Sequence, residues 1–194
     1  MTTSDDVLET TPGYVWTRRL HPTRSGQIGG IDGAVLAALR RGIGREAGTV
    51  AAMWPYYQHL NERGEVTRVL RAEHLVLTLF GVHQQSKRQP MHRAGVSVGA
   101  AMARLRGSDR FSTDAVERRF AAFATATSLT EAGTHLRGLV TQLREIDQVM
   151  DYTALLTDLV HWQNPERAGE VRRRWGLQFF VTKSKDDHNK SEEL

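Results

Sequence analysis

The chain of 194 residues contains no cysteine, which excludes disulfide bonds, a thiolate nucleophile and a thiolate metal site. No apolar run in it approaches the roughly 20 residues that a membrane-spanning helix needs. The first residues, MTTSDDVLETT, lack the basic and apolar regions of a signal peptide. Together these absences predict a cytoplasmic protein with no membrane partner.

Lysine is also scarce, since only four of the 26 basic residues are lysine and the others are arginine. The net charge is +4, but the first ten residues carry −3 and residues 183–194 carry −1, which leaves +8 for the chain between them. Arginine binds phosphate through two parallel hydrogen bonds and stacks on bases, so this middle part suits a nucleic-acid partner. The alternative is that the preference for arginine reflects GC-rich coding.

The sequence has no segment with the sustained apolar–polar alternation that is typical of β-strands. Apolar residues recur at helical spacing instead, which predicts an all-α fold of about eight or nine helices in two small packed bundles. We expect an N-terminal bundle over residues 11–107, a C-terminal bundle over 108–182 and a disordered tail over 183–194. The helical segments are expected at 12–20, 33–42, 48–60, 66–84, 97–106, 112–126, 128–146, 151–163 and 165–180.

The clearest helix boundaries lie in residues 151–180. Asp151 is predicted to cap one helix, and Asn164-Pro165 is predicted to end that helix and begin the next, with Asn164 as the N-cap. A capping box at Ser128–Glu131 is predicted to open the preceding long helix. The last helix is expected to turn three apolar residues inward: Val171, Trp175 and Phe179.

A loop with four glycines, at residues 26–33, leads directly into the helix expected at 33–42. Such a loop can bind a phosphate through its backbone N–H groups. No Lys-Ser/Thr pair completes a P-loop, however, and no strand precedes the loop. We therefore favour a flexible linker over a nucleotide-binding loop.

No pattern in the sequence indicates catalysis or a metal centre. The chain has eight histidines but no H-x-x-x-H, and His74 and His83 are too far apart in register to share a helix face. No serine stands in a G-x-S-x-G setting, and most acidic residues lie beside arginines, as in surface ion pairs. We expect no enzymatic activity, no metal and no cofactor.

The remaining signal is a set of basic residues on the solvent side of predicted amphipathic helices and in one polar loop. If the fold aligns them on one surface, they would neutralise phosphates without reading bases. If it does not, they are solvated charges scattered over all faces. The candidate nucleic-acid-binding residues are Arg40, Arg41, Lys87, Arg88, Arg93, Arg118, Arg119, Arg137, Arg144, Arg172 and Arg173.

Six segments follow one another in a recognisable order. They are GAVLAALRRG (33–42), AEHLVLTLFGVHQ (72–84), GVSVGAAMARL (95–105), AVERRFAAF (115–123), THLRGLVTQL (134–143), and DYTALLTDLVHWQNPE (151–166) with RRRWGLQFF (172–180). Their order and spacing over residues 14–180 resemble the CasB family, the small subunit of the type I-E CRISPR complex Cascade.

This resemblance implies a non-catalytic, all-helical protein that assembles, usually as two copies, in a crRNA-guided surveillance complex. The implied partners are other Cascade subunits, the crRNA, the displaced non-target DNA strand and a second copy of the chain. Contacts to the displaced strand would help to hold the R-loop open. This fits the division of roles in such complexes, in which the guide RNA reads the sequence and the protein contacts the backbone.

The resemblance also maps the family's basic positions onto this chain, at Arg40, Arg41, Arg118, Arg119 and Arg137. Some members have a second basic residue where this chain has Gly138, which predicts a contact to nucleic acid with fewer basic groups there. The roles assigned to residues 87, 88 and 93 rest on charge alone.

Two other functions fit the residues less well. One is a helical interaction scaffold whose basic faces contact acidic protein partners rather than DNA. The other is a helical DNA-binding regulator, but no short helix-turn-helix pair stands out in the sequence.

Overall fold

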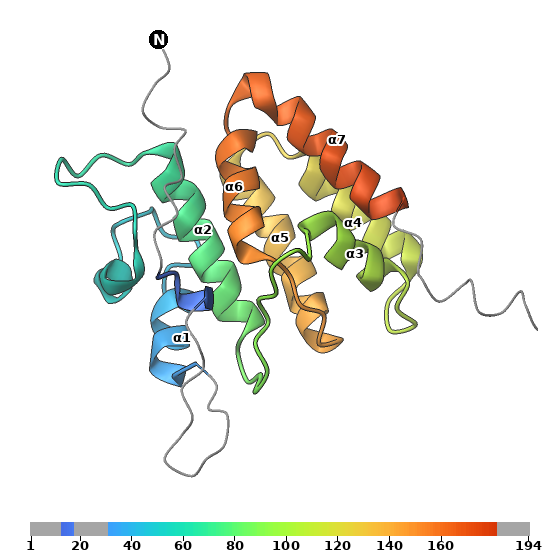
Figure 1. Cartoon of the computed structure of the whole chain (residues 1–194), viewed down its shortest axis with the longest axis horizontal. Helices are drawn as coiled ribbons and strands as arrows, with labels where there is room; N and C mark the ends of the chain where they lie inside the picture. Colours follow the sequence, from blue (N-terminus) through green and yellow to red (C-terminus); the bar gives the residue numbers. More distant parts are fainter. Residues whose placement is uncertain (1–12, 18–30, 182–194) are drawn as a thin grey trace, which may run out of the picture.

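The computed structural model describes residues 13–17 and 31–181 (Figure 1). In these ranges the chain forms seven α-helices and two short 3-10 helices, and no β-strand. One isolated bridge pairs His92 with Met150. The all-α class predicted from the sequence is therefore confirmed. The predictions for the glycine-rich loop, up to residue 30, and for the tail at 183–194 lie outside the described residues.

Three helices lie in the middle of the molecule, with α2 packed against both α5 and α6. Helix α1 packs on α2 at one end, and α3, α4 and α7 lie at the other end (Figure 1). The elements in chain order are η2 (Val15–Thr17), α1 (Gly33–Arg40), η3 (Ala51–Tyr56), α2 (Arg68–His83), α3 (Val98–Arg106), α4 (Thr113–Thr125), α5 (Leu129–Glu145), α6 (Tyr152–Trp162) and α7 (Pro165–Val181).

The predicted helix caps are present. Asp151 Oδ1 accepts a hydrogen bond from the Ala154 N–H at 3.0 Å, and Asn164 Oδ1 accepts one from the Glu166 N–H at 3.1 Å. The hydroxyl of Ser128 caps α5 as expected, by accepting from the N–H of the third helical residue. These side chains satisfy backbone donors that have no partner inside the helix, so they fix where α5, α6 and α7 begin.

The segment at 48–60 differs from the helical expectation. Only Ala51–Tyr56 is helical, as a 3-10 helix, and the chain is extended at Tyr57. Gly48 has a φ of +80°, and Pro55 has no N–H to donate, so the segment cannot form a regular α-helix. The Trp54 side chain is 54% exposed, and its indole N–H donates to the Gly48 carbonyl at 2.7 Å.

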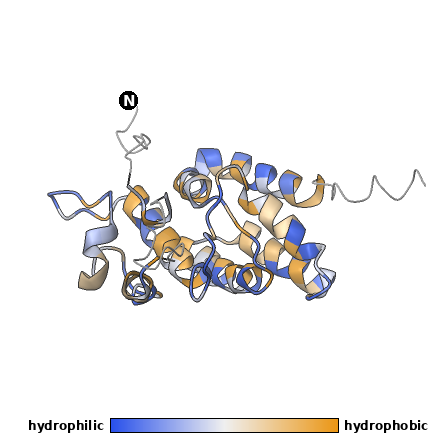
Figure 2. Ribbon diagram, turned by 60° about the horizontal axis from the view of Figure 1, so that its bottom comes forward, coloured by the Kyte–Doolittle hydropathy of each residue, from blue (hydrophilic) through white to orange (hydrophobic). Residues whose placement is uncertain are grey.

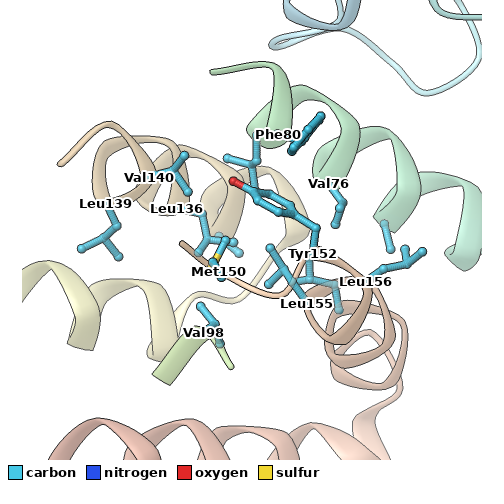
Figure 3. Close-up of a cluster of buried hydrophobic side chains, with 14 of the residues drawn as sticks. Val76, Phe80, Val98, Leu136, Leu139, Val140, Met150, Tyr152, Leu155 and Leu156 are labelled. Atoms are coloured by element: carbon cyan, nitrogen blue, oxygen red, sulfur yellow. The ribbon is translucent and has the colours of Figure 1, made fainter. Parts of the chain in front are cut away.

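The core is one connected cluster of apolar side chains. Hydrophobic and hydrophilic residues both occur along most of the helices, as in amphipathic helices (Figure 2). Near the centre of the core the ring of Tyr152 points from the start of α6 towards α2 and α5 (Figure 3). Tyr152 is fully buried and meets Phe80 edge to face, with ring centroids 5.2 Å apart. Its hydroxyl lies 2.8 Å from Nδ1 of the buried His83, so the polar end of this ring has a partner.

Helix packing continues across residue 107, where the sequence predicted a boundary between two bundles. Helix α3 packs against α7 and α5, and α2 packs against α5 and α6. The contact between α3 and α7 is close because Gly99 has no side chain, and an ideal Cβ there would lie 2.7 Å from the Trp175 carbonyl oxygen. The division at 107 stays a prediction about which parts fold on their own.

Candidate nucleic-acid interface

Two of the predicted basic residues meet at the C-terminal end of α2. The Arg40 guanidinium, from the end of α1, donates to the Gly81 carbonyl at 3.3 Å. The Arg144 guanidinium, from the end of α5, donates to the Val82 carbonyl at 3.3 Å. Carbonyls in the last turn of a helix lack partners within it and carry partial negative charge, so both arginines cap α2 electrostatically. Each arginine has five N–H donors, and these contacts leave others for a ligand.

Along α2, from Val66 just before the helix to Val82 near its end, lies a pocket of about 420 Å³ between the 42–47 loop, α2 and the first turns of α5. We call it the α2–α5 pocket. Much of its wall is aliphatic, and no Phe, Tyr or Trp among the described residues lines it. The aliphatic residues are Ile43, Ala47, Val66, Leu75, Leu79, Val82 and Leu129. Four of these, Ile43, Val66, Leu75 and Leu129, are only half-buried. The pocket therefore leaves apolar surface in contact with water.

Three exposed arginines, Arg45, Arg71 and Arg137, line the same pocket. Within the described part of the chain, no acidic side chain forms an ion pair with any of their guanidinium groups. Of the residues that the structure describes, Glu46 is the one acidic residue of the lining. The pocket thus combines an apolar wall with a surplus of positive charge, which suits an anionic ligand that has an apolar part.

The loop that carries Arg45 is held by a chain of buried hydrogen bonds. His74 Nε2 lies 2.9 Å from the Gly42 carbonyl oxygen, which can only accept, so this nitrogen is the donor. Nδ1 then accepts from the Tyr57 hydroxyl at 2.6 Å, and that hydroxyl accepts from the Gly48 N–H at 3.3 Å. Burial lowers the pKa of His74, so the ring is neutral at pH 7. With both nitrogens engaged, His74 is a wall of the pocket rather than a ligand.

The basic residues of the loop between α2 and α3 differ in whether an acidic side chain neutralises their charge. Lys87 forms an ion pair with Asp147, whereas Arg88 and Arg93 are exposed. The loop is ordered by the buried Gln84, whose amide nitrogen donates to the carbonyls of residues 87 and 89. Arg88 and Arg93 therefore present charge to solvent from a fixed loop, and Lys87 has its charge partly neutralised.

The other predicted residues lie on α4 and α7, at the end of the molecule away from α1 (Figure 1). Arg118 and Arg119 are exposed on α4, and Arg173 is exposed on α7. Arg172 donates to the carbonyl of Ala126, the C-cap residue of α4, at 3.0 Å, and its guanidinium lies 5.8 Å from the Trp162 ring centroid. The predicted set thus falls into two groups, one around α2 and α5 and one on α4 and α7.

Arg41 belongs to the first group by position, because it is the exposed C-cap residue that follows α1. Sequence reasoning missed Arg45 and Arg71 at the pocket. Arg71 precedes Leu75 by four residues, so a helix places both on one face, and this spacing could have indicated an exposed arginine beside an apolar wall. Arg45 carried no such signal, because it lies in an irregular loop.

Neither a metal centre nor a membrane span is found in the part of the chain that the structure describes. Over residues 13–17 and 31–181 no three His, Asp or Glu side chains are grouped as a metal ion would require. None of the helices in these ranges combines the length and apolar character that crossing a bilayer requires.

The model of the CRISPR-associated protein Cse2 family matches residues 35–180 of the chain. The chain belongs to the Cse2 family. A Cse2 protein from Thermus thermophilus is 24% identical over 159 residues, which cover 82% of this chain and 86% of that protein. The CasB family predicted from the order of the segments is confirmed by these Cse2 and CasB relatives.

Solved structures support the same assignment. The crystal structure of CasB from Thermobifida fusca superposes with a TM-score of 0.60 at 31% identity, covering 76% of this chain and 84% of that one. A chain from a structure of a CRISPR RNA-guided surveillance complex superposes with a TM-score of 0.62 at 25% identity, covering 81% and 87%. The Cse2 fold is therefore present over most of the described helices.

Proposed function

We propose that this Cse2-family protein is a non-catalytic subunit of a crRNA-guided type I-E surveillance complex, Cascade. In that complex it binds nucleic acid without sequence preference and holds the displaced non-target strand of the R-loop. Exchange of a DNA duplex for an RNA–DNA duplex is nearly balanced in free energy, so modest contacts to the displaced strand are enough to favour the open state. Its partners are then other Cascade subunits, the crRNA and the non-target strand.

The observation that carries this proposal is the set of exposed arginines Arg45, Arg71 and Arg137 at the α2–α5 pocket, which have no acidic partner among the described residues. Exposed arginines without acidic partners are the ones that gain most from phosphate, since they give up no ion pair on binding. Arg40 and Arg144 add positive charge at the C-terminal end of α2. Binding of this kind depends steeply on salt and tolerates any base sequence.

The test is a fluorescence-anisotropy titration of the purified protein with unrelated single-stranded and duplex DNAs over a series of salt concentrations. We expect affinity to be independent of sequence and to fall steeply as salt rises. The double variant R71E/R137E should lower both the affinity and the salt slope, by roughly one unit of slope for each phosphate that the protein no longer binds.

A matched control is the double variant R63E/R104E, which makes the same change in net charge at two exposed arginines away from the pocket. If both double variants weaken binding equally, overall charge rather than this surface is responsible. If wild-type protein binds no DNA even at low salt, the arginines would instead contact acidic protein partners, and the strand-holding function would be wrong.

Three exposed apolar residues at the end of α7 provide a surface for assembly. Leu177, Phe180 and Val181 are 63%, 60% and 67% exposed, and their spacing puts them on one side of the helix. We assign this side of α7 to contacts with neighbouring Cascade subunits, a second copy of the chain included. The variant F180D should fold and bind DNA as wild type does but fail to co-purify with the assembled complex.

A further inference from the structure

The α2–α5 pocket has a shape and chemistry that the holding of a phosphate backbone does not explain. Backbone binding needs exposed cations, but it does not need a pocket of about 420 Å³ with an aliphatic wall. Pockets of this size hold small organic molecules, usually against apolar side chains with a few charged groups at the edge. The pocket therefore calls for a ligand that is anionic on one side and apolar on the other.

We propose that the α2–α5 pocket takes an unstacked base of a bound single strand, while its arginines hold the flanking phosphates. This inference rests on the proposed function, because it assumes that a strand passes along this surface. A nucleotide has the required chemistry, with a planar ring that is largely apolar on its faces joined to a charged phosphate. The half-buried Leu75 and Leu129 provide wall for the ring, and Arg71 and Arg137 provide charge for the phosphates.

The pocket walls are fixed in advance, so no folding cost is paid when a base enters. Gly42 packs so closely that an ideal Cβ would lie 2.9 Å from His74 Cε1. Helix α5 begins at the pocket, where Leu129 and Thr130 line the wall, and Glu131 in its first turn offsets the positive partial charge of that helix end. The positive charge at the pocket therefore comes from its arginines.

A base in this pocket would give the protein a means to distinguish a displaced strand from a duplex. Bases in a duplex are paired and stacked, and removing one costs a few kcal/mol, whereas a base in a single strand is already free. The positive surface attracts both forms through their phosphates, but only the single strand can fill the pocket. We therefore expect tighter binding of a single strand than of a duplex at equal salt.

The test compares a single-stranded DNA with one of the same length in which every base is replaced by an abasic tetrahydrofuran unit. Both strands carry the same phosphates, so any difference in anisotropy-measured affinity comes from the bases. Wild-type protein should bind the base-bearing strand about tenfold more tightly, which is the size of one well-placed base contact. The variant T134W, which puts a large side chain into the pocket lining, should reduce this ratio to about one.

A matched control is T125W. Thr125 and Thr134 are both exposed helical threonines whose hydroxyls donate to the carbonyl four residues earlier, but only Thr134 lines the pocket. T125W should keep the tenfold ratio, and circular dichroism should show the same helix content in both variants. A 2-aminopurine base in the strand should brighten on binding to wild type and not on binding to T134W, since it leaves its stack without meeting an aromatic side chain.

Equal affinity for the two strands in wild type would overturn the base pocket and leave the salt-dependent backbone binding intact. Equal affinity together with loss of complex assembly in T134W would assign the pocket to an acidic protein segment, and would also overturn it. No binding of either strand at low salt would reject both the pocket inference and the proposed function. The titrations, together with co-purification of T134W with the assembled complex, distinguish the three results.

Discussion

The indole N–H of Trp175 on α7 donates a hydrogen bond to Asp158 Oδ2 on α6 at 2.6 Å. The other carboxylate oxygen of Asp158 accepts from the Arg174 guanidinium. Asp158 is 8% exposed and Trp175 is fully buried, so this contact joins the two helices where water is largely excluded. A buried carboxylate needs such partners, and they in turn fix how α7 lies on α6.

The variant D158A should lower the free energy of unfolding by about 3 kcal/mol, because it leaves the buried Trp175 N–H without an acceptor. D158N keeps an acceptor oxygen of the same shape and should cost clearly less. Urea denaturation followed by circular dichroism measures both variants. Equal losses for D158A and D158N would mean that the charge, through Arg174, matters more than the indole contact.

The contact between Asp158 and Trp175 also shows which part of the fold the sequence does not predict. The apolar spacing in 151–180 predicted that Val171, Trp175 and Phe179 face inward, and all three are buried. The spacing does not predict that the guanidinium of Arg174 contacts the carboxylate of Asp158. Periodicity predicts which face of a helix is apolar, but it does not show which polar residue on the facing helix lies opposite.

The candidate site shows the same limit. The helices that carry Arg40, Arg137 and Arg144 could be predicted, because each has an apolar stripe and a cap or a clear end. That two of these arginines meet at the end of α2 depends on the packing of α1 and α5 against it, which has no local signal. The α2–α5 pocket is likewise formed by three segments distant in sequence.

The crossing of α3 and α7 should be sensitive to one methyl group. In G99A an ideal Cβ would lie 2.7 Å from the Trp175 carbonyl oxygen and 2.6 Å from Gln178 Cβ, so the helices must separate. We expect a loss of about 2 kcal/mol in the free energy of unfolding. G176A on α7 meets nothing within 4 Å and should gain about 0.5–1 kcal/mol, because alanine is the better helix former. Denaturant titration of both variants should therefore show changes of opposite sign, and a loss of stability in both would contradict the role of close approach.

Stability should fall in mild acid because of the buried His83. Burial lowers the pKa of His83 from 6.5 to about 4, so the unfolded chain binds a proton at a higher pH than the folded chain does. The free energy of unfolding should therefore be unaffected by His83 above about pH 6.5 and should decrease as the pH falls from there towards 4. Between pH 7 and pH 5 the expected decrease from this residue is about 2 kcal/mol.

Urea denaturation at several pH values tests this, with H83Q as the comparison. The variant should lose most of the decrease between pH 7 and pH 5. A smaller decrease should remain, since burial also lowers the pKa of His74 and His92. An identical pH dependence in wild type and H83Q would show that another group is responsible.

Arg40 and Arg41 are neighbours whose structural roles differ, so variants of the two residues can distinguish an effect on stability from an effect on DNA binding. Arg40 donates to the Gly81 carbonyl at the end of α2, whereas Arg41 is exposed. R40A should lower the free energy of unfolding by about 1 kcal/mol, and R41A should leave it within about 0.5 kcal/mol of wild type. If both guanidinium groups also contact phosphates, each variant should weaken DNA binding and reduce the salt slope by about one unit. Denaturation and anisotropy on the same two proteins give both results. Loss of stability in R41A would contradict the difference in structural role. An unchanged salt slope in both variants would show that this end of α1 serves the fold alone.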